Sequence, residues 1–416
     1  MTTPGAFGRR TAIKMGLAAT AAAALPVRRA RAQAPKEVKI ALVVPLSGPW
    51  ARQGILEQMG AEMAIEDVNK AGGVKALGGA KLKLVLYDTG DTAEKAKNAA
   101  QRLVAQEPDV VGGIGCWLSS FTLAATEVSE RAELPWLTLS YSDLITSRGF
   151  KYVFQTAPTA EAQSTALLPR IVDLASKATG SKPTKVAFVG DNSASSVSFM
   201  KPIREHTAKD LGLTIVADEV YTPPLADATT MVQKIRSGRP DFIVFQSTNV
   251  GDDKLLLDKF AERGITPSKV PLIGGGGHWT VPELMKIAGK EHLEGMIVGL
   301  ANWPGKAVED VEKRFIAKTG EPWFGHDSIF PYAHILIYKE ALERTASVDR
   351  KKLGEMLHKI DLKDGPAKFF PDGRVKFEEN GRRVGAELCI VQWQKGRPTA
   401  VHPESIAISK AVWPKS

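Results

Sequence analysis

Apolar and polar positions along the first third of the chain switch regularly between a strand pattern and a helix pattern. Residues 38–46 form an apolar run of strand length, after which Leu56, Met59 and Met63 recur at helical spacing until a glycine pair at 72–73. The alternation continues with a strand at 82–87, a helix at 93–106 and a strand at 110–114. Strands separated by single helices predict an α/β fold with a parallel sheet.

A second set of alternating segments begins at Glu161. It comprises strands at 185–190, 214–216, 242–246 and 271–273, and helices at 195–211, 228–236, 252–263 and 281–287. Residues 152–158 and 295–300 have the extended pattern of crossings between the two sets. Three later helices, at 307–318, 329–344 and 351–360, are expected to return to the first set. The segments 376–377 and 388–394, with turns at 372–373 and 395–396, predict a hairpin-type ending.

This order predicts two doubly wound, Rossmann-like lobes joined by a multi-strand hinge. The first lobe is expected to contain 36–159 and about 300–365, and the second 160–299 and about 366–416. Each lobe is long enough to bury its own core. Residues 380–383 are interpreted as a turn with exposed charge.

The first 32 residues have the order of an export signal. A twin-arginine pattern over residues 8–14 precedes a weakly apolar run at 15–25, which is too short to span a bilayer. Cleavage after Ala32 fits the small residues Ala30 and Ala32, and no lipid-attachment cysteine follows. We therefore expect a soluble periplasmic protein exported by the twin-arginine route. A disordered basic tail is the competing interpretation.

The charge of the chain argues against a nucleic-acid partner. The formal net charge is +9, but the segment before Ala32 holds six Arg and Lys residues and no acid, so setting it aside leaves +3. No later segment has the length and apolarity of a membrane helix. Cys116 and Cys389 are too few for a disulfide scaffold, and two separate buried thiols are the favoured interpretation, although pairing cannot be read from sequence.

Polar loops follow the predicted strands where a parallel sheet presents ligand sites. Ser119 and Ser120 stand where a strand gives way to a helix, so their hydroxyls and the neighbouring N–H groups suit an anionic or strongly polar ligand group. The alternative is that both serines only cap the helix. Ser140, Tyr141 and Ser142 follow the next predicted strand in the same way.

The order of these segments also carries a family resemblance. The segments 45–49, 69–73, 87–88 and 115–120, continued by 152–158, 185–191, 241–247, 295–299 and 389–396, resemble the branched-chain amino-acid binding proteins of bacterial ABC importers. The resemblance covers nearly all of the chain after the export signal. It implies a type 1 periplasmic binding fold, a clamshell whose two lobes close on a ligand, and places Ser119, Ser120 and the 140–142 loop at that ligand.

The sequence departs from the family pattern where amino-acid binders hold the ligand's ammonium group with carboxylates. Those positions read Ala160 and Gly276, although a shift of one residue would bring in Glu161. A buried ammonium without a carboxylate partner is costly. We therefore favour a small organic carboxylate with an apolar or aromatic body. Amides, urea-like ligands and branched-chain amino acids remain open.

Further candidates come from the aromatic and polar positions of the resemblance. The pattern's aromatic positions read Gln53, Ser195 and Asn249, while Trp50, Trp117, His278 and Trp279 add rings or polar tips near the predicted cleft. Trp117, Tyr141 and Trp279 would supply flat apolar surface to the ligand. Each tryptophan has core packing as its alternative, and His278 has helix capping.

An enzyme is the least favoured class. The glycines at 112–115 do not complete a dinucleotide fingerprint, no phosphate-loop lysine motif is present, and the seven histidines lack zinc-ligand spacing. We expect no catalytic residue, metal or cofactor. The resemblance implies an inner-membrane ABC permease with separate ATPase subunits as partner, and monomer is the expected state. A ligand sensor for a membrane receptor or regulator is the remaining alternative.

Overall fold

Two sheets organise residues 35–414, the part of the chain that the computed structural model describes. The first has five strands in the order β2-β1-β3-β4-β5, and the second has seven in the order β14-β13-β10-β9-β8-β6-β7. We call each sheet with its covering helices the first lobe and the second lobe. The predicted export signal lies outside the described residues.

The strands alternate with helices along most of the described chain. The strands are β1 (Glu37–Val44), β2 (Lys81–Asp88), β3 (Val110–Gly115), β4 (Trp136–Thr138), β5 (Val153–Gln155), β6 (Lys185–Asp191), β7 (Thr214–Tyr221), β8 (Phe242–Gln246), β9 (Leu272–Gly275), β10 (Ile297–Leu300), β11 (Asp361–Leu362), β12 (Val375–Lys376), β13 (Cys389–Gln394) and β14 (Arg397–His402). The α-helices are α1 (Ala51–Lys70), α2 (Ala93–Gln106), α3 (Ser119–Arg131), α4 (Ala160–Thr179), α5 (Ala194–Pro202), α6 (Ala208–Asp210), α7 (Thr229–Gly238), α8 (Val250–Glu262), α9 (Pro282–Ala288), α10 (Lys290–Leu293), α11 (Glu309–Thr319), α12 (His326–Thr345) and α13 (Arg350–Lys359).

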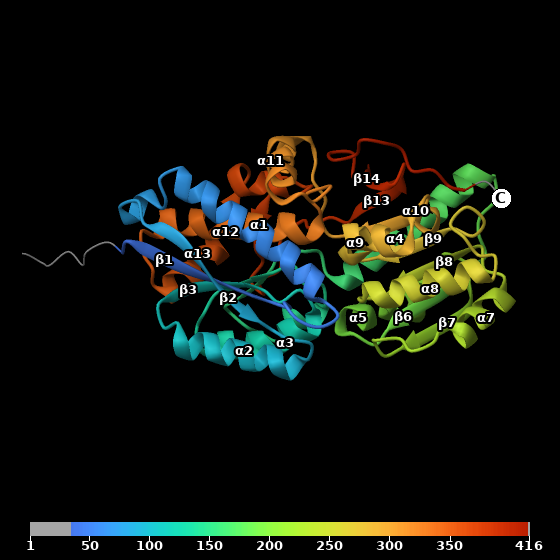
Figure 1. Cartoon of the computed structure of the whole chain (residues 1–416), viewed down its shortest axis with the longest axis horizontal. Helices are drawn as coiled ribbons and strands as arrows, with labels where there is room; N and C mark the ends of the chain where they lie inside the picture. Colours follow the sequence, from blue (N-terminus) through green and yellow to red (C-terminus); the bar gives the residue numbers. More distant parts are fainter. Residues whose placement is uncertain (1–34, 415–416) are drawn as a thin grey trace, which may run out of the picture. The chain divides into compact units, whose positions relative to one another are not determined.

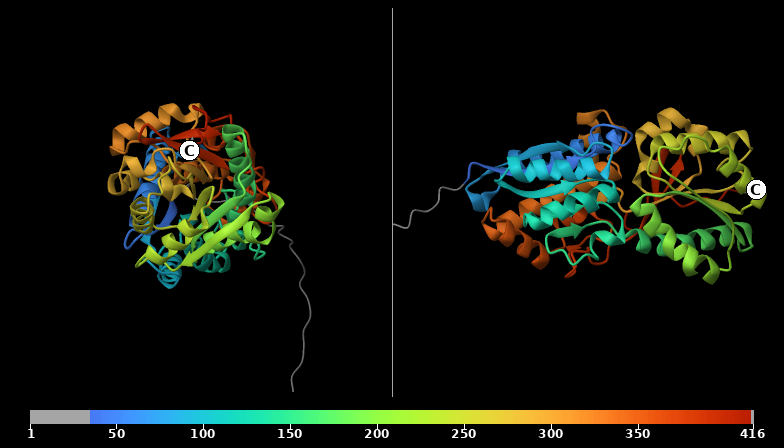
Figure 2. Two further views of the ribbon diagram at one scale, coloured as in Figure 1. Left: turned by 90° about the vertical axis from the view of Figure 1, so that its right-hand side faces the viewer. Right: turned by 90° about the horizontal axis from the view of Figure 1, so that it is seen from below.

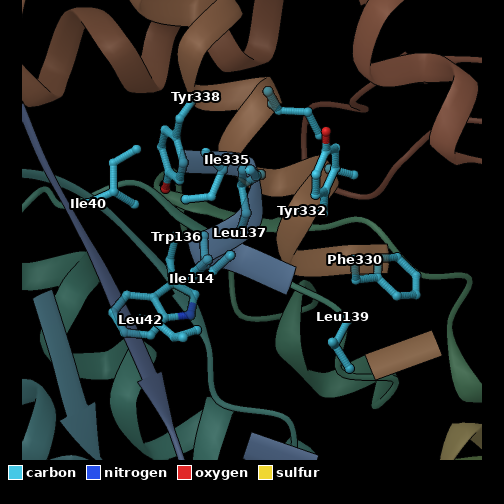
Figure 3. Packing of buried hydrophobic residues seen from close by; sticks show 14 of the residues in the cluster. Ile40, Leu42, Ile114, Trp136, Leu137, Leu139, Phe330, Tyr332, Ile335 and Tyr338 are labelled. Carbon is cyan, nitrogen blue, oxygen red and sulfur yellow. The ribbon is translucent and has the colours of Figure 1, made fainter. Parts of the chain in front are cut away.

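The first sheet is parallel throughout and is buried between two helical layers. Its strand β1 pairs in parallel with both β2 and β3. Helices α2 and α3 lie together on one face, while α1, α12 and α13 lie together on the other (Figure 1). Figure 3 shows side chains of α12, among them Ile335 and Tyr338, beside Ile40 and Ile114 of the sheet. The continuous apolar run from Ile40 to Val44 of β1 and the apolar β3 follow from this burial on both faces.

The second sheet divides its side chains between two cores. Val186 and Phe188 of β6 pack in one apolar cluster with α4 and α5, whereas Ala187 and Val189 pack in another with α7, α8 and α9. Figure 2 shows helices on both sides of this sheet. Strands β13 and β14 extend the sheet in antiparallel fashion through the turn at Lys395 and Gly396. The α/β fold predicted from the sequence is confirmed.

The C-terminal third differs from the sequence-based expectation in two respects. Strand β12 pairs with β11, and β13 pairs with β10 and β14, so residues 376–377 and 388–394 form no hairpin with each other. Phe369, Phe370 and Phe377 pack in the first lobe's core, although we expected residues from about 366 onwards in the second lobe. Their aromatic side chains find apolar surface against α12 and β5 rather than against the second sheet.

The chain crosses between the lobes three times: after β5, after β10, and between β12 and β13. Arg383, in the third crossing, is buried, which contradicts the expected exposed turn at 380–383. Its guanidinium donates to the Thr156 carbonyl of the first crossing (2.7 Å) and to both carboxylate oxygens of Asp372 (2.5 and 2.6 Å). It also lies over the Phe370 ring, 4.5 Å from the centroid. The Asp372 carboxylate and the carbonyl make the burial of this charge tolerable.

Candidate functional site

A cavity lies where loops from both lobes meet at the carboxyl ends of β3, β4, β8 and β9. The empty space among the atoms that line it, open solvent included, is about 360 Å³. The residues that line it are Trp117, Leu118, Ser119, Leu139, Ser140, Tyr141, Ser195, Gln246, Ser247, Thr248, Gly275, Gly276, Gly277, His278 and His326. Ligand sites at the carboxyl ends of parallel strands are the rule for this class of sheet.

Ser119 is the first residue of α3, and its hydroxyl ties two loops of the first lobe together. Its Oγ accepts the backbone N–H groups of Tyr141 (3.1 Å) and Ser142 (3.0 Å). Two accepted hydrogen bonds use the oxygen's acceptor capacity, which leaves the hydroxyl hydrogen to donate. The N–H groups in the first turn of α3 have no partners within the helix. The first-lobe wall therefore offers donors to the cavity.

Ser140 and Tyr141 line the same wall but differ in what they leave available. The Ser140 hydroxyl donates to the Trp117 carbonyl (2.7 Å) and contacts the Thr122 hydroxyl (2.6 Å), so its hydrogen bonds are used inside the lobe. The Tyr141 hydroxyl hydrogen-bonds His326 Nε2 at 2.9 Å, and the two rings stand edge to face. Ser140 thus shapes the loop, whereas Tyr141 and His326 form a coupled pair at the cavity surface.

Trp117 presents an aromatic wall in a fixed orientation. Its backbone has a φ of 56°, in the left-handed region, and its indole Nε1 donates to Asp327 Oδ1 at 2.8 Å. The ring meets the His278 ring edge to face at 6.3 Å between centroids. Burial raises the pKa of Asp327 to about 7. The Trp117 ring therefore contacts the second lobe at His278, and its hydrogen bond to Asp327 fixes its orientation within the first lobe.

The second-lobe wall contains a serine, a histidine and an aspartate in contact. Ser247 donates to Asp253 Oδ1 at 2.5 Å, and His278 Nε2 lies 3.3 Å from both Ser247 Oγ and Asp253 Oδ2. Burial raises the pKa of the Asp253 carboxyl more than the Ser247 hydroxyl lowers it. In a hydrolytic triad the serine and the carboxylate contact opposite nitrogens of the imidazole. Here both contact the same nitrogen, so this geometry is not that of a triad.

Gln246 and Thr248 flank Ser247 on the same wall. The Thr248 hydroxyl donates to Asp191 Oδ2 at 2.6 Å. The Gln246 side-chain oxygen is buried and has no hydrogen-bond partner. It lies so close to Gly275 that a Cβ added there would be 1.9 Å from it. Glycine at 275 is therefore required for the observed position of the Gln246 amide.

Carboxylates and strong cations do not line this cavity within residues 35–414. Ala160 and Gly276 stand at the two positions where the family resemblance implies carboxylates. Ala160 begins α4, Gly276 lines the cavity, and the neighbouring Glu161 is exposed on the surface. Burial lowers the pKa of both His278 and His326 to about 3, so both imidazoles are neutral at pH 7. The lining carries no formal charge at that pH.

Half of the residues expected at the site do line the cavity: Trp117, Ser119, Ser140, Tyr141, Ser195 and His278. Ser120 follows Ser119 on α3 but does not line the cavity. Ser142 faces the other lobe, where its hydroxyl contacts the Ser198 hydroxyl at 3.0 Å. Trp50 also bridges the lobes, since its Nε1 donates to the Thr248 carbonyl at 3.0 Å and its ring packs on Phe121.

Three more expected residues lie away from the cavity for reasons of packing or capping. Trp279 is fully buried in the second core against Phe245. Asn249 caps α8, where its side-chain oxygen accepts the N–H groups of Gly251 and Asp252. Gln53 is buried on α1, and neither of its side-chain polar atoms has a partner.

Several lining residues escaped the sequence analysis: Leu118, Leu139, Gln246, Ser247, Thr248, Gly275, Gly277 and His326. A signal for Gln246, Ser247 and Thr248 was present, because they directly follow the predicted strand at 242–246. The sequence contained no signal for His326. It is the first residue of α12, three residues before the predicted start of that helix, and α12 reaches the cavity from a distant part of the sequence.

Comparison with known proteins decides the family. Residues 37–398 match the model of the periplasmic binding protein family. The chain belongs to that family. The Leu/Ile/Val-binding protein homolog 7 of Brucella melitensis is 29% identical over 415 residues, covering 97% of this chain and 99% of that protein. The resemblance seen in the sequence is thereby confirmed, and the family's members are solute-binding proteins rather than enzymes.

Solved structures show the same type 1 periplasmic binding fold. The branched-chain amino acid transporter substrate binding protein LivJ from Streptococcus pneumoniae, in complex with isoleucine, superposes with a TM-score of 0.75 at 21% identity, covering 88% of this chain and 100% of that one. A solute binding protein of an ABC transporter from Rhodopseudomonas palustris BisB5, in complex with 3,4-dihydroxybenzoic acid, gives 0.71 at 21% identity, covering 86% and 93%.

Other features of the described chain complete the picture. Within residues 35–414, no helix is both long and apolar enough to cross a membrane. The same residues contain no group of three or more side chains suited to hold a metal ion. Cys116 and Cys389 are separate, buried free thiols.

Proposed function

We propose that this periplasmic binding protein is the solute-binding component of an ABC importer and that its ligand is a small carboxylate with an apolar or aromatic body and no ammonium group. One observation supports this most directly: the cavity offers hydrogen-bond donors at the start of α3 but no carboxylate on its lining. An ammonium group buried there would lack a charged partner.

The proposed binding mode follows from the first-lobe wall. The ligand carboxylate accepts hydrogen bonds from the Ser119 hydroxyl and from N–H groups in the first turn of α3, where the helix dipole favours negative charge. Trp117, Leu118 and Leu139 contact the apolar body of the ligand. Second-lobe residues such as His278 cover it from the opposite side.

Ligand binding and closure of the lobes are coupled in this proposal, because the cavity is lined from both lobes. The bonds from Trp50 to Thr248 and between Ser142 and Ser198 add contacts that exist only when the lobes are together. A ligand that touches both walls shifts the population toward the closed arrangement. The closed form would then be recognised by an inner-membrane permease with separate ATPase subunits, after export of the monomeric chain to the periplasm by the twin-arginine route.

The solved relatives bind ligands of two different classes. LivJ was solved with isoleucine and the Rhodopseudomonas protein with 3,4-dihydroxybenzoic acid, so this fold accommodates amino acids and aromatic acids alike. The uncharged lining of the present cavity favours the second class. A branched-chain amino acid is the main competitor.

Thermal denaturation with a ligand panel tests the proposal. Aromatic carboxylates, aliphatic carboxylates, amino acids and amides are added separately to the purified protein. A ligand present at about a hundred times its Kd stabilises by about 2.7 kcal/mol, which shifts the Tm by several degrees. We expect shifts with carboxylates and none with leucine or valine. Shifts with the amino acids alone would refute the proposal.

A further inference from the structure

Two hydrogen bonds join the lobes beside the cavity, and each uses a different element of the second lobe. The Thr248 carbonyl, in the loop between β8 and α8, accepts the Trp50 indole N–H at 3.0 Å. The Ser198 hydroxyl, on α5, contacts the Ser142 hydroxyl at 3.0 Å. Both elements also line the cavity, α5 through Ser195 and the loop through Thr248. The contact between the lobes therefore depends on how α5 and this loop are placed relative to each other.

The side chain of Asp191, the last residue of β6, bonds to both of these elements. Its Oδ2 accepts the Thr248 hydroxyl at 2.6 Å, and its Oδ1 accepts the backbone N–H of Ser193, the N-cap residue of α5, at 2.9 Å. Asp191 is 2% exposed, so water competes little for either bond. Hydrogen bonds to a carboxylate are roughly twice as strong as those between neutral groups. One buried side chain thus fixes the start of α5 and the loop before α8 to the same strand.

A second bond between α5 and this loop joins neutral groups. The Ser196 hydroxyl donates to the Gln246 carbonyl at 2.8 Å, which holds the end of β8 rather than Thr248. Asp191 is therefore the group that orients Thr248, whose carbonyl faces Trp50.

We propose that Asp191 is a positioning residue for closure of the lobes: it holds Thr248 and α5 where Trp50 and Ser142 of the first lobe can bond to them. This inference rests on the proposed function, because it takes closure to accompany ligand binding, but it does not depend on which ligand is bound. Asp191 does not line the cavity. Its effect on affinity should therefore pass through the two bonds between the lobes.

The second lobe itself depends little on this carboxylate. Strand β6 is held by backbone pairing with β7 and β8 and by apolar side chains such as Val189. Within residues 35–414, the hydrogen bonds of the Asp191 side chain go to Ser193 and Thr248. Loss of the carboxylate should therefore disturb the surface that meets the first lobe more than the core of the second.

A mutant cycle distinguishes a positioning role from a purely structural one. Benzoate and leucine are titrated by calorimetry into the wild type, Asp191→Asn, the double variant of Trp50→Phe with Ser142→Ala, and the triple variant. Asparagine keeps the size of Asp191 but replaces one acceptor oxygen by a donor. We expect Asp191→Asn to weaken binding of the probe that binds by about fivefold or more in the wild type. Where both bonds between the lobes are already absent, it should weaken binding by less than about twofold.

Asp241→Asn is the matched control. Asp241 directly precedes β8, and its exposed carboxylate accepts the N–H groups of Thr184 and Lys185 at the opposite end of β6. This variant should keep the wild-type affinity for both probes.

Two substitutions of Thr248 test the same bond from the other side and replace Asp191→Asn if that variant does not fold. Thr248→Val removes the hydroxyl donor and should reproduce the loss of affinity, whereas Thr248→Ser keeps the donor and should retain the wild-type affinity. Because Thr248 also lines the cavity, the valine variant is measured in the double-variant background as well. Its effect should shrink there to less than about twofold.

Hydrogen exchange of the Trp50 indole N–H, followed by NMR, gives a readout that needs no ligand. The bond to the Thr248 carbonyl protects this hydrogen whenever the lobes are together. Exchange should be severalfold faster in Asp191→Asn than in the wild type or in Asp241→Asn.

The outcomes separate this inference from the proposed function. Equal losses of affinity in the two backgrounds, or an unchanged affinity in Asp191→Asn, would overturn the positioning role. If leucine binds and benzoate does not, the proposed ligand class fails, and the cycle carried out with leucine still decides the role of Asp191. If neither probe binds, the exchange rate decides it, and an unchanged rate in Asp191→Asn overturns the inference.

Discussion

The imidazole of His326, on the first lobe, lies directly against the backbone of Gly277 on the second. A Cβ added at position 277 would be 2.2 Å from His326 Cδ2, well inside van der Waals contact. Glycine is therefore required here by the closeness of the two lobes. The contact joins the start of α12 to the loop after β9, and it is made only while the lobes are together.

Gly277→Ala is expected to oppose closure without disturbing either lobe. The added methyl group collides with His326 in the closed arrangement and meets solvent when the lobes part. Affinity for the ligand identified in the thermal panel should fall by about fivefold or more, since overpacking costs about 1–3 kcal/mol. Calorimetry gives the affinity, and thermal denaturation without ligand gives the control, which should stay near the wild-type Tm. An unchanged affinity would contradict the role assigned to this contact.

Trp50→Phe should weaken ligand binding more than it weakens the fold. Phenylalanine keeps the edge-to-face contact with Phe121 but loses the bond from Nε1 to the Thr248 carbonyl across the lobes. A lost hydrogen bond of this kind costs about 0.5–1.5 kcal/mol, or about two- to tenfold in Kd. Trp393→Phe is the matched control, because its Nε1 bonds Trp279 within the second lobe. That variant should lose stability and keep its affinity, and the reverse pattern would refute the assignment.

Asp327→Asn should make stability less dependent on pH. Burial raises the folded-state pKa of Asp327 to about 7 from an ordinary value of 3.8, while Trp117 and Arg52 favour its charged form and the buried Glu57 carboxyl lies near it. The folded wild type then holds a proton that the unfolded chain has lost, so its stability falls as pH rises from about 4 to 7.

The asparagine variant lacks this loss and keeps an oxygen for the Trp117 indole. Its free energy of unfolding should exceed the wild-type value at pH 8 by on the order of a few kcal/mol, and by much less at pH 4. Urea denaturation at the two pH values measures the difference. Asp173→Asn, at an exposed carboxylate of α4, is the control and should change stability by less than about 0.5 kcal/mol at either pH. An equal effect of Asp327→Asn at both pH values would show that the carboxyl does not titrate in this window.

Arg383→Met should be strongly destabilising because it leaves Asp372 without the guanidinium nitrogen that contacts both of its carboxylate oxygens in the crossing region. Breaking a buried ion pair from one side typically costs about 3–5 kcal/mol. Arg374→Met is the comparison, since Arg374 pairs with Asp361 at the surface and such pairs contribute about 0–1 kcal/mol. Urea denaturation of both variants gives the two values. Equal losses would mean that burial of the Arg383 pair carries no extra stability.

The sequence predicted the α/β fold and most of its strands and helices because strand and helix periods are local signals. The first-lobe loops at the cavity could also be predicted from the sequence, since Ser119 and Tyr141 follow predicted strands. Trp279 was misplaced because a tryptophan beside a glycine run looks the same whether it faces a cavity or a core. His326 could not be found, because its position depends on how a distant helix packs.

The burial of Arg383 was hidden for a related reason. A pair of arginines after Asn380 and Gly381 has the composition of a surface turn, and only the folded structure brings Asp372 and the Thr156 carbonyl to one of them. Hydrogen bonds between segments far apart in the chain leave no periodic trace in the sequence. The orphaned oxygen of Gln246 is invisible to sequence for the same reason.

The position of Arg383 also bears on how the molecule can bend. The Arg383 guanidinium, which belongs to the third crossing, donates hydrogen bonds to Thr156 in the first crossing and to Asp372 in the first lobe. These strands cannot slide past one another without releasing a desolvated cation. We therefore expect the backbone rotations that open and close the molecule to occur on the second-lobe side of the Arg383 hydrogen bonds. The lobes would then move as nearly rigid bodies, and the same residues of the two cavity walls would face each other after each closure.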